Sequence, residues 1–167
     1  CKTGRYNLCP DVIFFATPPV DGVFQEYVAH EADLCFKLPE NVSTLEGALI
    51  EPLAVGFHAA IQGGARIGQT AVVMGAGCIG LVSMMALKAM GVSNVYIVDI
   101  MEKRLEKALE LGATGIINAK EKNAIEEVMK ITNNNGCDLV IETAGTEITT
   151  AQDSLVMSFL HSYYIQL

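Results

Sequence analysis

Residues 70–80 read Thr-Ala-Val-Val-Met-Gly-Ala-Gly-Cys-Ile-Gly, a short apolar run followed at once by three glycines in the spacing G-x-G-x-x-G. Each glycine has a separate task in such a turn. Gly75 permits the tight turn out of a strand, Gly77 removes a side chain where a phosphate group approaches the backbone, and Gly80 lets a helix pack closely on a sheet. The run is therefore typical of a strand that turns directly into a helix.

The residues around the glycines fit that interpretation. The pattern predicts a strand over residues 71–74 and a buried helix over residues 81–90, which Gly91 ends. The free N–H groups at the helix start, together with the helix dipole, then face the phosphates of a ligand. We therefore predict that this turn binds a dinucleotide. Glycines that merely permit tight packing are the alternative explanation.

Asp99 completes the unit at the end of a second apolar strand, predicted over residues 95–99. A carboxylate at this distance from the glycines accepts hydrogen bonds from both hydroxyls of an adenosine ribose. It would also repel a 2′-phosphate. The sequence therefore favours NAD over NADP as the cofactor.

Composition excludes several classes of function. The 167 residues are enough for one domain, or for one domain and part of another, and 51% of them are hydrophobic and 18% charged, as in globular proteins. The net charge of −8 argues against a nucleic-acid partner, because no basic stripe is present to neutralise phosphates.

Membrane insertion and disulfide bonding are not expected either. The apolar stretch over residues 78–90 contains Lys88 and is too short to span a bilayer, and no signal peptide is visible. We therefore expect a cytoplasmic protein that does not engage a membrane. Five cysteines form an odd count without dense spacing, which favours reduced thiols or a metal site.

Helical and strand patterns alternate after Asp99. Helices are predicted over residues 102–111 and 123–132, and strands over residues 116–117 and 137–142. Strands separated by helices imply right-handed βαβ units, so the expected fold class is α/β with a Rossmann-type parallel sheet. Such a sheet needs two more strands, and therefore we expect it to be incomplete.

The sequence before the glycines has a different character. Alternating apolar and polar residues predict strands over residues 23–28 and 34–38, the end of a small β-rich domain. The C-terminal stretch has no glycine and ends in an apolar run with no strand after it. We therefore divide the chain as follows: residues 1–50, the end of the β-rich domain; 51–69, a linking helix; 70–150, the dinucleotide-binding domain; and 151–167, an anomalous tail.

Ser43 and Glu46 have the spacing of a capping box, so a short helix is expected to begin there. We expect that helix to break near Glu51, because the residue before a proline is pushed out of the α region. Pro52 suits the first position of a new helix, which is predicted to run to about Gln62.

Seven blocks of sequence, spread in order over residues 1 to about 152, carry a resemblance to a known family. They are CKTGRYNLC (1–9), ATPPVDG (16–22), FQEY (24–27), KLP (37–39), EGALIEPLAVG (46–56), GAGCIG (75–80) and DLVIETAG (138–145). The chain resembles the zinc-dependent medium-chain dehydrogenases, and within them the polyol dehydrogenases of the sorbitol (L-iditol) type. The resemblance implies a GroES-like catalytic domain ahead of the NAD-binding domain.

The activity implied by the resemblance is oxidation of a secondary alcohol of a polyol of the sorbitol, L-iditol or xylitol type. A catalytic Zn²⁺ binds and acidifies the hydroxyl, and NAD accepts the hydride. The resemblance also implies that the full-length protein is a homo-oligomer.

Two metal sites follow from the resemblance. Glu51 matches the family glutamate at the catalytic zinc, although it also suits the N-terminus of the helix at Pro52. Cys1 and Cys9 match the last two of four thiolates that hold a structural zinc in part of the family. None of the histidines has a ligand-like neighbour in sequence, so none is assigned to a metal: His30, His58 and His161.

The cofactor site implied by the resemblance extends beyond the glycines and Asp99. Arg104 corresponds to a basic position that touches the ribose, although a solvated arginine is the alternative. Thr143 and its two successors correspond to the adenosine side, and Glu142 is interpreted as a strand-end acid with a structural partner. The predicted cofactor-binding residues are Gly75, Gly77, Cys78, Ile79, Gly80, Asp99, Arg104, Thr143, Ala144 and Gly145.

The chain also departs from the family pattern. The principal zinc ligands of the family, a cysteine and a His-Glu pair, would precede residue 1, and the chain begins with Cys1 rather than Met. We therefore expect a piece of a longer enzyme that is inactive by itself. Two alternatives stay open: another zinc alcohol or threonine dehydrogenase, and a dinucleotide-binding module without catalysis.

Overall fold

The computed structural model describes residues 8–157 and 163–166 and divides the chain into two compact units. The boundary between the units lies between Asn41 and Val42. Within the described ranges, no helix has the length and apolar character that a membrane crossing requires.

Residues 9–41 consist of turns, bends and irregular backbone together with the 3-10 helix η2 (Ala32–Leu34). The strands predicted over residues 23–28 and 34–38 are wrong, because these described residues form no strand. The Gln25 N–H donates to the Val23 carbonyl at 2.8 Å, a tight turn that interrupts the first predicted strand. A segment with an alternating pattern forms a strand only where its backbone N–H and C=O groups can pair with those of a neighbouring strand.

The second unit opens with α1 (Thr44–Ala48), which begins with the predicted capping box. The Ser43 hydroxyl accepts from the Glu46 N–H at 3.2 Å, and the Glu46 carboxylate accepts from the Ser43 N–H at 2.8 Å. The Ser43 hydroxyl, and after it the Ser43 N–H, holds the pKa of Glu46 below its ordinary value. The start of α1 is therefore as predicted.

The next helix, α2 (Ile50–Gln62), begins earlier than predicted. The break between α1 and α2 falls at Leu49, and Glu51 lies in the first helical turn instead of outside it. Pro52 is tolerated there because the first N–H groups of a helix have no partner within it, so the missing N–H removes no hydrogen bond. The predicted end at Gln62 is confirmed.

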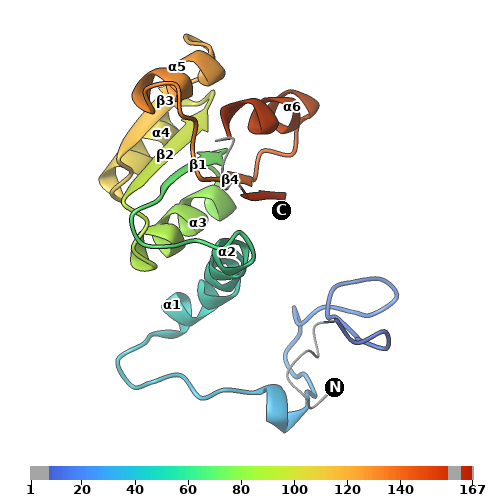
Figure 1. Cartoon of the computed structure of the whole chain (residues 1–167). Coiled ribbons are helices and arrows are strands. Elements are labelled where there is room, and N and C mark those ends of the chain that lie inside the picture. The colour runs from blue at the N-terminus through green and yellow to red at the C-terminus, as the bar shows by residue number, and fades with distance from the viewer. Residues whose placement is uncertain (1–7, 158–162, 167) are drawn as a thin grey trace. The chain divides into compact units, whose positions relative to one another are not determined.

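Five parallel strands form the centre of this unit in the order β3-β2-β1-β4-β5 (Figure 1). They are β1 (Thr70–Met74), β2 (Asn94–Asp99), β3 (Gly115–Asn118), β4 (Leu139–Glu142) and β5 (Tyr163–Gln166). The described residues thus supply five of the six positions of the doubly wound Rossmann order. The predicted fold class is confirmed.

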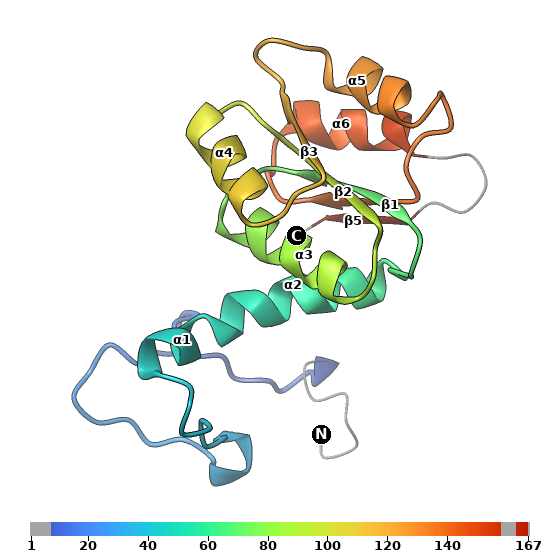
Figure 2. The same cartoon turned by 90° about the vertical axis from the view of Figure 1, so that its left-hand side faces the viewer.

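Helices cover both faces of the sheet (Figure 2). One face is covered by α2, α3 (Cys78–Ala89) and α4 (Glu102–Glu110), and the other by α5 (Ala124–Ile131) and α6 (Glu147–Val156). Along β1, Ala71 and Val73 pack against the first set of helices, whereas Val72 and Met74 pack against the second. A strand that is buried on both faces is apolar throughout, which explains the unbroken apolar run before the glycines.

The close approach of α2 to α3 depends on Gly56. A Cβ atom added to Gly56 would lie 2.9 Å from the Ser83 backbone nitrogen and 2.9 Å from the Val82 carbonyl oxygen. Both contacts are with backbone, which cannot turn aside as a side chain can. Gly56 therefore fixes the distance between these two helices.

The stretch 151–167 differs from the expected anomalous tail. Its first residues complete α6, whose N-terminus is capped by the Thr146 hydroxyl, which accepts from the Thr149 N–H at 3.1 Å. Tyr163–Gln166 then pairs with β4 as β5, with Tyr163 opposite Leu139. Residue His161 lies outside the described residues. Tyrosine and isoleucine favour strands, and the edge of β4 gives this run a partner for its backbone.

Candidate dinucleotide-binding site

The glycine turn joins the end of β1 to the start of α3. Gly75 has a φ of +102°, which glycine adopts without strain, and its N–H donates to the Val98 carbonyl at 2.8 Å. A Cβ atom on Gly80 would collide with the Gly75 carbonyl oxygen. The tight turn and the close helix packing predicted for these two glycines are therefore both present.

Gly77 lies at the N-cap of α3 and leaves open space beside the backbone. No atom of the described residues lies within 4 Å of the position that its Cβ atom would take. No side chain in the described part of the chain caps this helix N-terminus, and Cys78, the first helical residue, is exposed. Uncapped N–H groups at the positive end of a helix dipole suit an anionic group such as a pyrophosphate.

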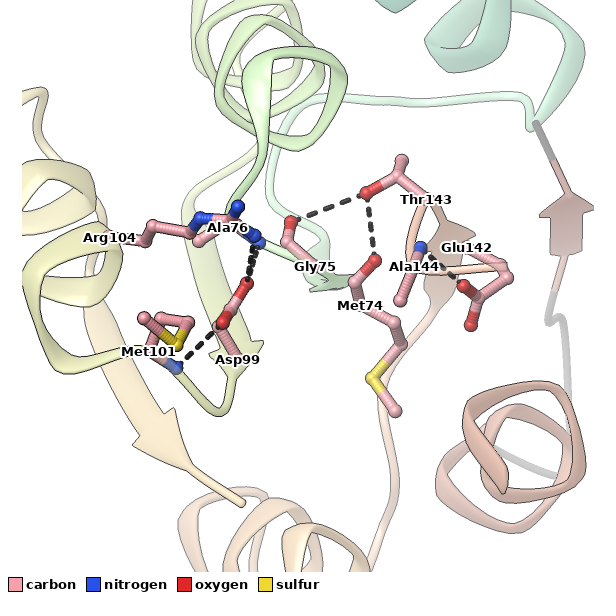
Figure 3. A network of polar contacts seen from close by, with 9 residues as sticks. All are labelled: Met74, Gly75, Ala76, Asp99, Met101, Arg104, Glu142, Thr143 and Ala144. Carbon is pink, nitrogen blue, oxygen red and sulfur yellow. Dashed lines mark hydrogen bonds and ion pairs between the residues drawn. The ribbon is translucent and has the colours of Figure 1, made fainter. Parts of the chain in front are cut away.

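The Asp99 carboxylate lies against the glycine turn from the β2 side (Figure 3). Its Oδ2 accepts from the Ala76 N–H at 2.7 Å, and its Oδ1 accepts from the Met101 N–H at 2.8 Å. The relative solvent-exposed area of the Asp99 side chain is 7%. Because each carboxylate oxygen has two lone pairs, Asp99 can accept further donors while it retains both backbone N–H groups.

Arg104 lies in the first turn of α4, near this carboxylate. Its Nη1 is 4.0 Å from Asp99 Oδ2, and its side chain is 59% exposed. An exposed pair at this distance contributes little to stability. The Arg104 side chain is therefore free to turn toward a ligand bound at Asp99.

The turn after β4 reaches the glycine turn from the opposite side. The Thr143 N–H donates to the Met74 carbonyl at 2.9 Å. The Thr143 hydroxyl donates to the same carbonyl at 2.8 Å and to the Gly75 carbonyl at 3.3 Å. Figure 3 shows the Thr143 side chain pointing at these two oxygens. Residues distant in sequence therefore meet at the carboxyl ends of β1 and β4.

Glu142 shapes the turn that carries Thr143. This carboxylate is fully buried, and its Oε1 accepts from the Ala144 N–H at 2.6 Å and from the Gly145 N–H at 2.8 Å. The expectation of a strand-end acid with a structural partner is confirmed. Its Oε2 is buried without a hydrogen-bond partner in the part of the chain that the structure describes.

Two contacts in this site were not predicted from the sequence. They are the hydrogen bond from Ala76 to Asp99 and the hydrogen bonds from Thr143 to the glycine turn. A polar residue directly after a buried strand is the signal that points to such contacts, because the carboxyl ends of neighbouring parallel strands lie side by side. That signal does not say which neighbouring turn the side chain contacts.

The residues predicted to bind zinc remain predictions. Glu51 is exposed in the first turn of α2, and its side chain forms no hydrogen bond or ion pair with another described residue. Cys9 is partly buried, and Cys1 lies outside the described residues. Within residues 8–157 and 163–166, no three or more His, Cys, Asp or Glu side chains are grouped so as to hold a metal ion.

His30, His58 and Cys137 differ in their surroundings. The His30 ring packs against Phe15 with a centroid distance of 4.9 Å, and His58 is exposed on α2. Cys137 is buried, and its thiol donates to the Val156 carbonyl at 3.3 Å. Burial raises the pKa of Cys137 to about 12. This thiol is therefore not a nucleophile near neutral pH.

Both a family model and curated proteins match this chain. The family model of zinc-binding dehydrogenases matches residues 78–158. Sorbitol dehydrogenase of Bacillus subtilis is 49% identical over 145 residues, which are 87% of this chain and 41% of that protein.

Solved structures agree with these sequence matches. An Escherichia coli oxidoreductase/dehydrogenase of unknown specificity has a TM-score of 0.91 at 42% identity, covering 95% of this chain and 46% of that chain. A candidate zinc-binding dehydrogenase of Sinorhizobium meliloti, bound to NADP, has a TM-score of 0.90 at 27% identity, covering 99% of this chain and 48% of that chain.

The chain spans about two fifths of the length of the curated relatives it matches. The matches include both the residues before α1 and the strands and helices of the second unit, since they extend over most of this chain. In both sequence and structure, this chain is similar to zinc-type alcohol and polyol dehydrogenases.

Proposed function

We propose that residues 70–150 form a domain that binds a nicotinamide dinucleotide and prefers NAD to NADP. The observation that carries the proposal is the position of Asp99, a nearly buried carboxylate hydrogen-bonded to the N–H of Ala76 in the glycine turn. A carboxylate fixed there accepts the ribose hydroxyls, and it repels a phosphate on the 2′ oxygen.

The residues of the turn fit such a ligand. Gly77 leaves the backbone accessible, and the uncapped start of α3 offers N–H groups to the pyrophosphate. Asp99 would orient the adenosine ribose, with Arg104 beside it. When bound, the dinucleotide supplies the hydride chemistry, and the chain supplies binding and orientation.

We further propose that the substrate is a secondary alcohol of a polyol. The support is the 49% identity to sorbitol dehydrogenase of Bacillus subtilis. Glu51 is proposed to contribute to a catalytic zinc site, and Cys1 and Cys9 to a structural one. The described residues do not fit a zinc ion by themselves, because no three ligand side chains are grouped among them. No step of the reaction is therefore assigned to zinc.

Calorimetric titration of the chain with NADH, and separately with NADPH, tests the cofactor proposal. We expect saturable NADH binding that is at least about tenfold tighter than NADPH binding, a difference of about 1.4 kcal/mol. The variant Asp99→Ala is expected to lose most of the NADH affinity. No binding by a folded chain, or equal affinities for the two nucleotides, would contradict the proposal.

Asp138 provides a matched control. Its carboxylate accepts from the Thr70 N–H at 2.8 Å, so it makes the same kind of bond as Asp99 but at the other end of β1. Asp138→Ala removes a comparable contact and leaves the glycine turn intact. We expect this variant to bind NADH as the wild type does, even where its stability is reduced.

Oxidation assays of the full-length protein with sorbitol, a simple primary alcohol and threonine test the substrate proposal against the related dehydrogenases. Turnover of sorbitol alone supports a polyol dehydrogenase, and preference for another substrate contradicts it. NADH binding without turnover of any of the three would favour a dinucleotide-binding module.

A further inference from the structure

We propose that Thr143 is a positioning residue for the dinucleotide, whose hydroxyl holds the glycine turn in the shape that receives the pyrophosphate. This inference rests on the proposed dinucleotide binding and assigns Thr143 a different task from lining the adenosine side. It follows from where the hydroxyl hydrogen atom is directed.

The first observation is the direction of the hydrogen bonds. The Thr143 hydroxyl donates to the Met74 carbonyl at 2.8 Å and to the Gly75 carbonyl at 3.3 Å. Both oxygens belong to the backbone immediately before Ala76 and Gly77. A hydroxyl has a single hydrogen atom, and here it is directed at the turn instead of at the space where a ligand would lie.

The second observation is the fit between Thr143 and the two glycines that shape the turn. A Cβ atom on Gly75 would lie 2.8 Å from the Thr143 Oγ1, and one on Gly80 would lie 3.0 Å from it. The hydroxyl therefore occupies the space that both glycines leave free. The Thr143 Oγ1 is therefore in close contact with the turn on its β4 side.

The third observation is that the turn is held from two sides. On the β2 side, the Gly75 N–H donates to Val98 and the Ala76 N–H donates to Asp99. On the β4 side, Thr143 supplies the hydrogen bonds to the carbonyls of the same turn. Figure 3 shows Gly75 between the Asp99 and Thr143 side chains. Removal of the hydroxyl leaves the turn held mainly from the β2 side.

Thr143 is itself fixed in place. Its backbone N–H donates to the Met74 carbonyl at 2.9 Å, and the next two N–H groups donate to the buried Glu142 carboxylate. The side chain therefore projects from a turn that is hydrogen-bonded on both sides of it. A well-supported side chain is what a positioning role requires.

Titration of Thr143 variants with NADH and with adenosine tests the proposal. Thr143→Val and Thr143→Ala both remove the hydroxyl, and the alanine variant avoids placing a methyl group 2.8 Å from the Met74 oxygen. We expect about three- to tenfold weaker NADH binding, the effect of one neutral hydrogen bond. Adenosine affinity is expected to be unchanged, because adenosine lacks the pyrophosphate. Thr143→Ser keeps the hydroxyl and is expected to restore NADH binding.

Thr132→Val is the matched control. The Thr132 hydroxyl donates to the Val128 carbonyl at 2.7 Å at the end of α5 and accepts from the Gly136 N–H at 3.1 Å, so a hydroxyl is removed from a different turn while residues 74–80 are left unchanged. This variant is expected to bind NADH as the wild type does.

The possible outcomes separate this inference from the proposed function. If the wild type binds NADH and both hydroxyl-free variants bind it equally well, the positioning role is wrong and the dinucleotide site stands. Parallel losses of NADH and adenosine affinity would show direct contact with adenosine and overturn the role. Failure of Thr143→Ser to restore binding would also overturn it. A wild type that does not bind NADH overturns both proposals.

Discussion

The Asp99 carboxylate accepts a hydrogen bond from the Ala76 N–H at 2.7 Å, so the acid at the end of β2 is part of the glycine turn that follows β1. The residue proposed to select the ribose therefore also holds the turn that is proposed to receive the phosphates. Changes at Asp99 are expected to affect the fold as well as ligand binding.

Asp99→Asn is expected to destabilise the chain without any nucleotide present. Both Asp99 oxygens accept backbone N–H groups, whereas an asparagine side chain has one oxygen and one NH2 group. One backbone donor then faces another donor, at a cost of about 1–3 kcal/mol. Urea denaturation measures the loss. Asp138→Asn is the control, since a single Asp138 oxygen accepts a hydrogen bond and an amide oxygen can replace it. Equal losses in the two variants would contradict this explanation.

Alanine at Gly77 and at Gly80 is expected to have different effects. Gly77→Ala places its methyl group in open space, so stability is expected to be retained, but NADH binding is expected to fall by at least about tenfold because that space is proposed to receive the pyrophosphate. Gly80→Ala forces the methyl group against the Gly75 carbonyl and reduces both stability and binding. Thermal denaturation with calorimetry separates the two effects. A Gly77→Ala chain that binds NADH normally would rule out this path for the ligand.

Glu142→Gln is expected to fold with a free energy of unfolding close to that of the wild type. The glutamine oxygen can keep both hydrogen bonds that the Ala144 and Gly145 N–H groups donate. Glu142→Ala removes the acceptor and leaves a cavity beside the end of β4, which costs about 2–4 kcal/mol. Chemical denaturation of the two variants gives the comparison. Similar losses in both would mean that the charge of Glu142, rather than its acceptor oxygen, supports the turn.

The buried thiol of Cys137 is expected to make the free energy of unfolding fall as the pH rises through the alkaline range. Burial raises its pKa from 9.0 to about 12 in the folded chain. Below about pH 9 the thiol is protonated in both states, so its contribution is fully present there. Between about pH 9 and pH 12 only the unfolded chain loses the proton, and stability falls by up to about 1.4 kcal/mol per pH unit.

Denaturation of the wild type and of Cys137→Ala from about pH 8 to about pH 10.5 isolates this contribution. The alanine variant is less stable at pH 8 because of the cavity, but its stability is expected to fall less steeply with pH. Parallel curves would show that Cys137 ionises equally in both states.

The central sheet was predictable because its signals are local. The apolar run of β1, the glycine turn and Asp99 lie close together in sequence, and each of β1 to β4 lies within two residues of its predicted bounds at each end. The capping box at Ser43 is likewise contained within four residues. These patterns need no knowledge of distant neighbours.

The errors arose where distant neighbours decide the structure. Residues 23–28 alternate as a strand does, but no described partner pairs with them in the first unit. Tyr163–Gln166 was expected to be part of an anomalous tail, yet it pairs with the edge of β4. The contact of Thr143 with Gly75 depends in the same way on β4 lying beside β1, which no local pattern specifies.

The pairing of β1 with β4 has a consequence for folding. Met74 lies opposite Glu142, and the Thr143 hydroxyl reaches a carbonyl 69 residues away in the chain. Contacts of such long range form slowly, because a large loop must close before they are made. The complete turn therefore exists only after β4 has joined the sheet, and a nucleotide that needs this turn would bind the native state alone. At a nucleotide concentration of about 100 times Kd, such selective binding would add about 2.7 kcal/mol to the free energy of unfolding.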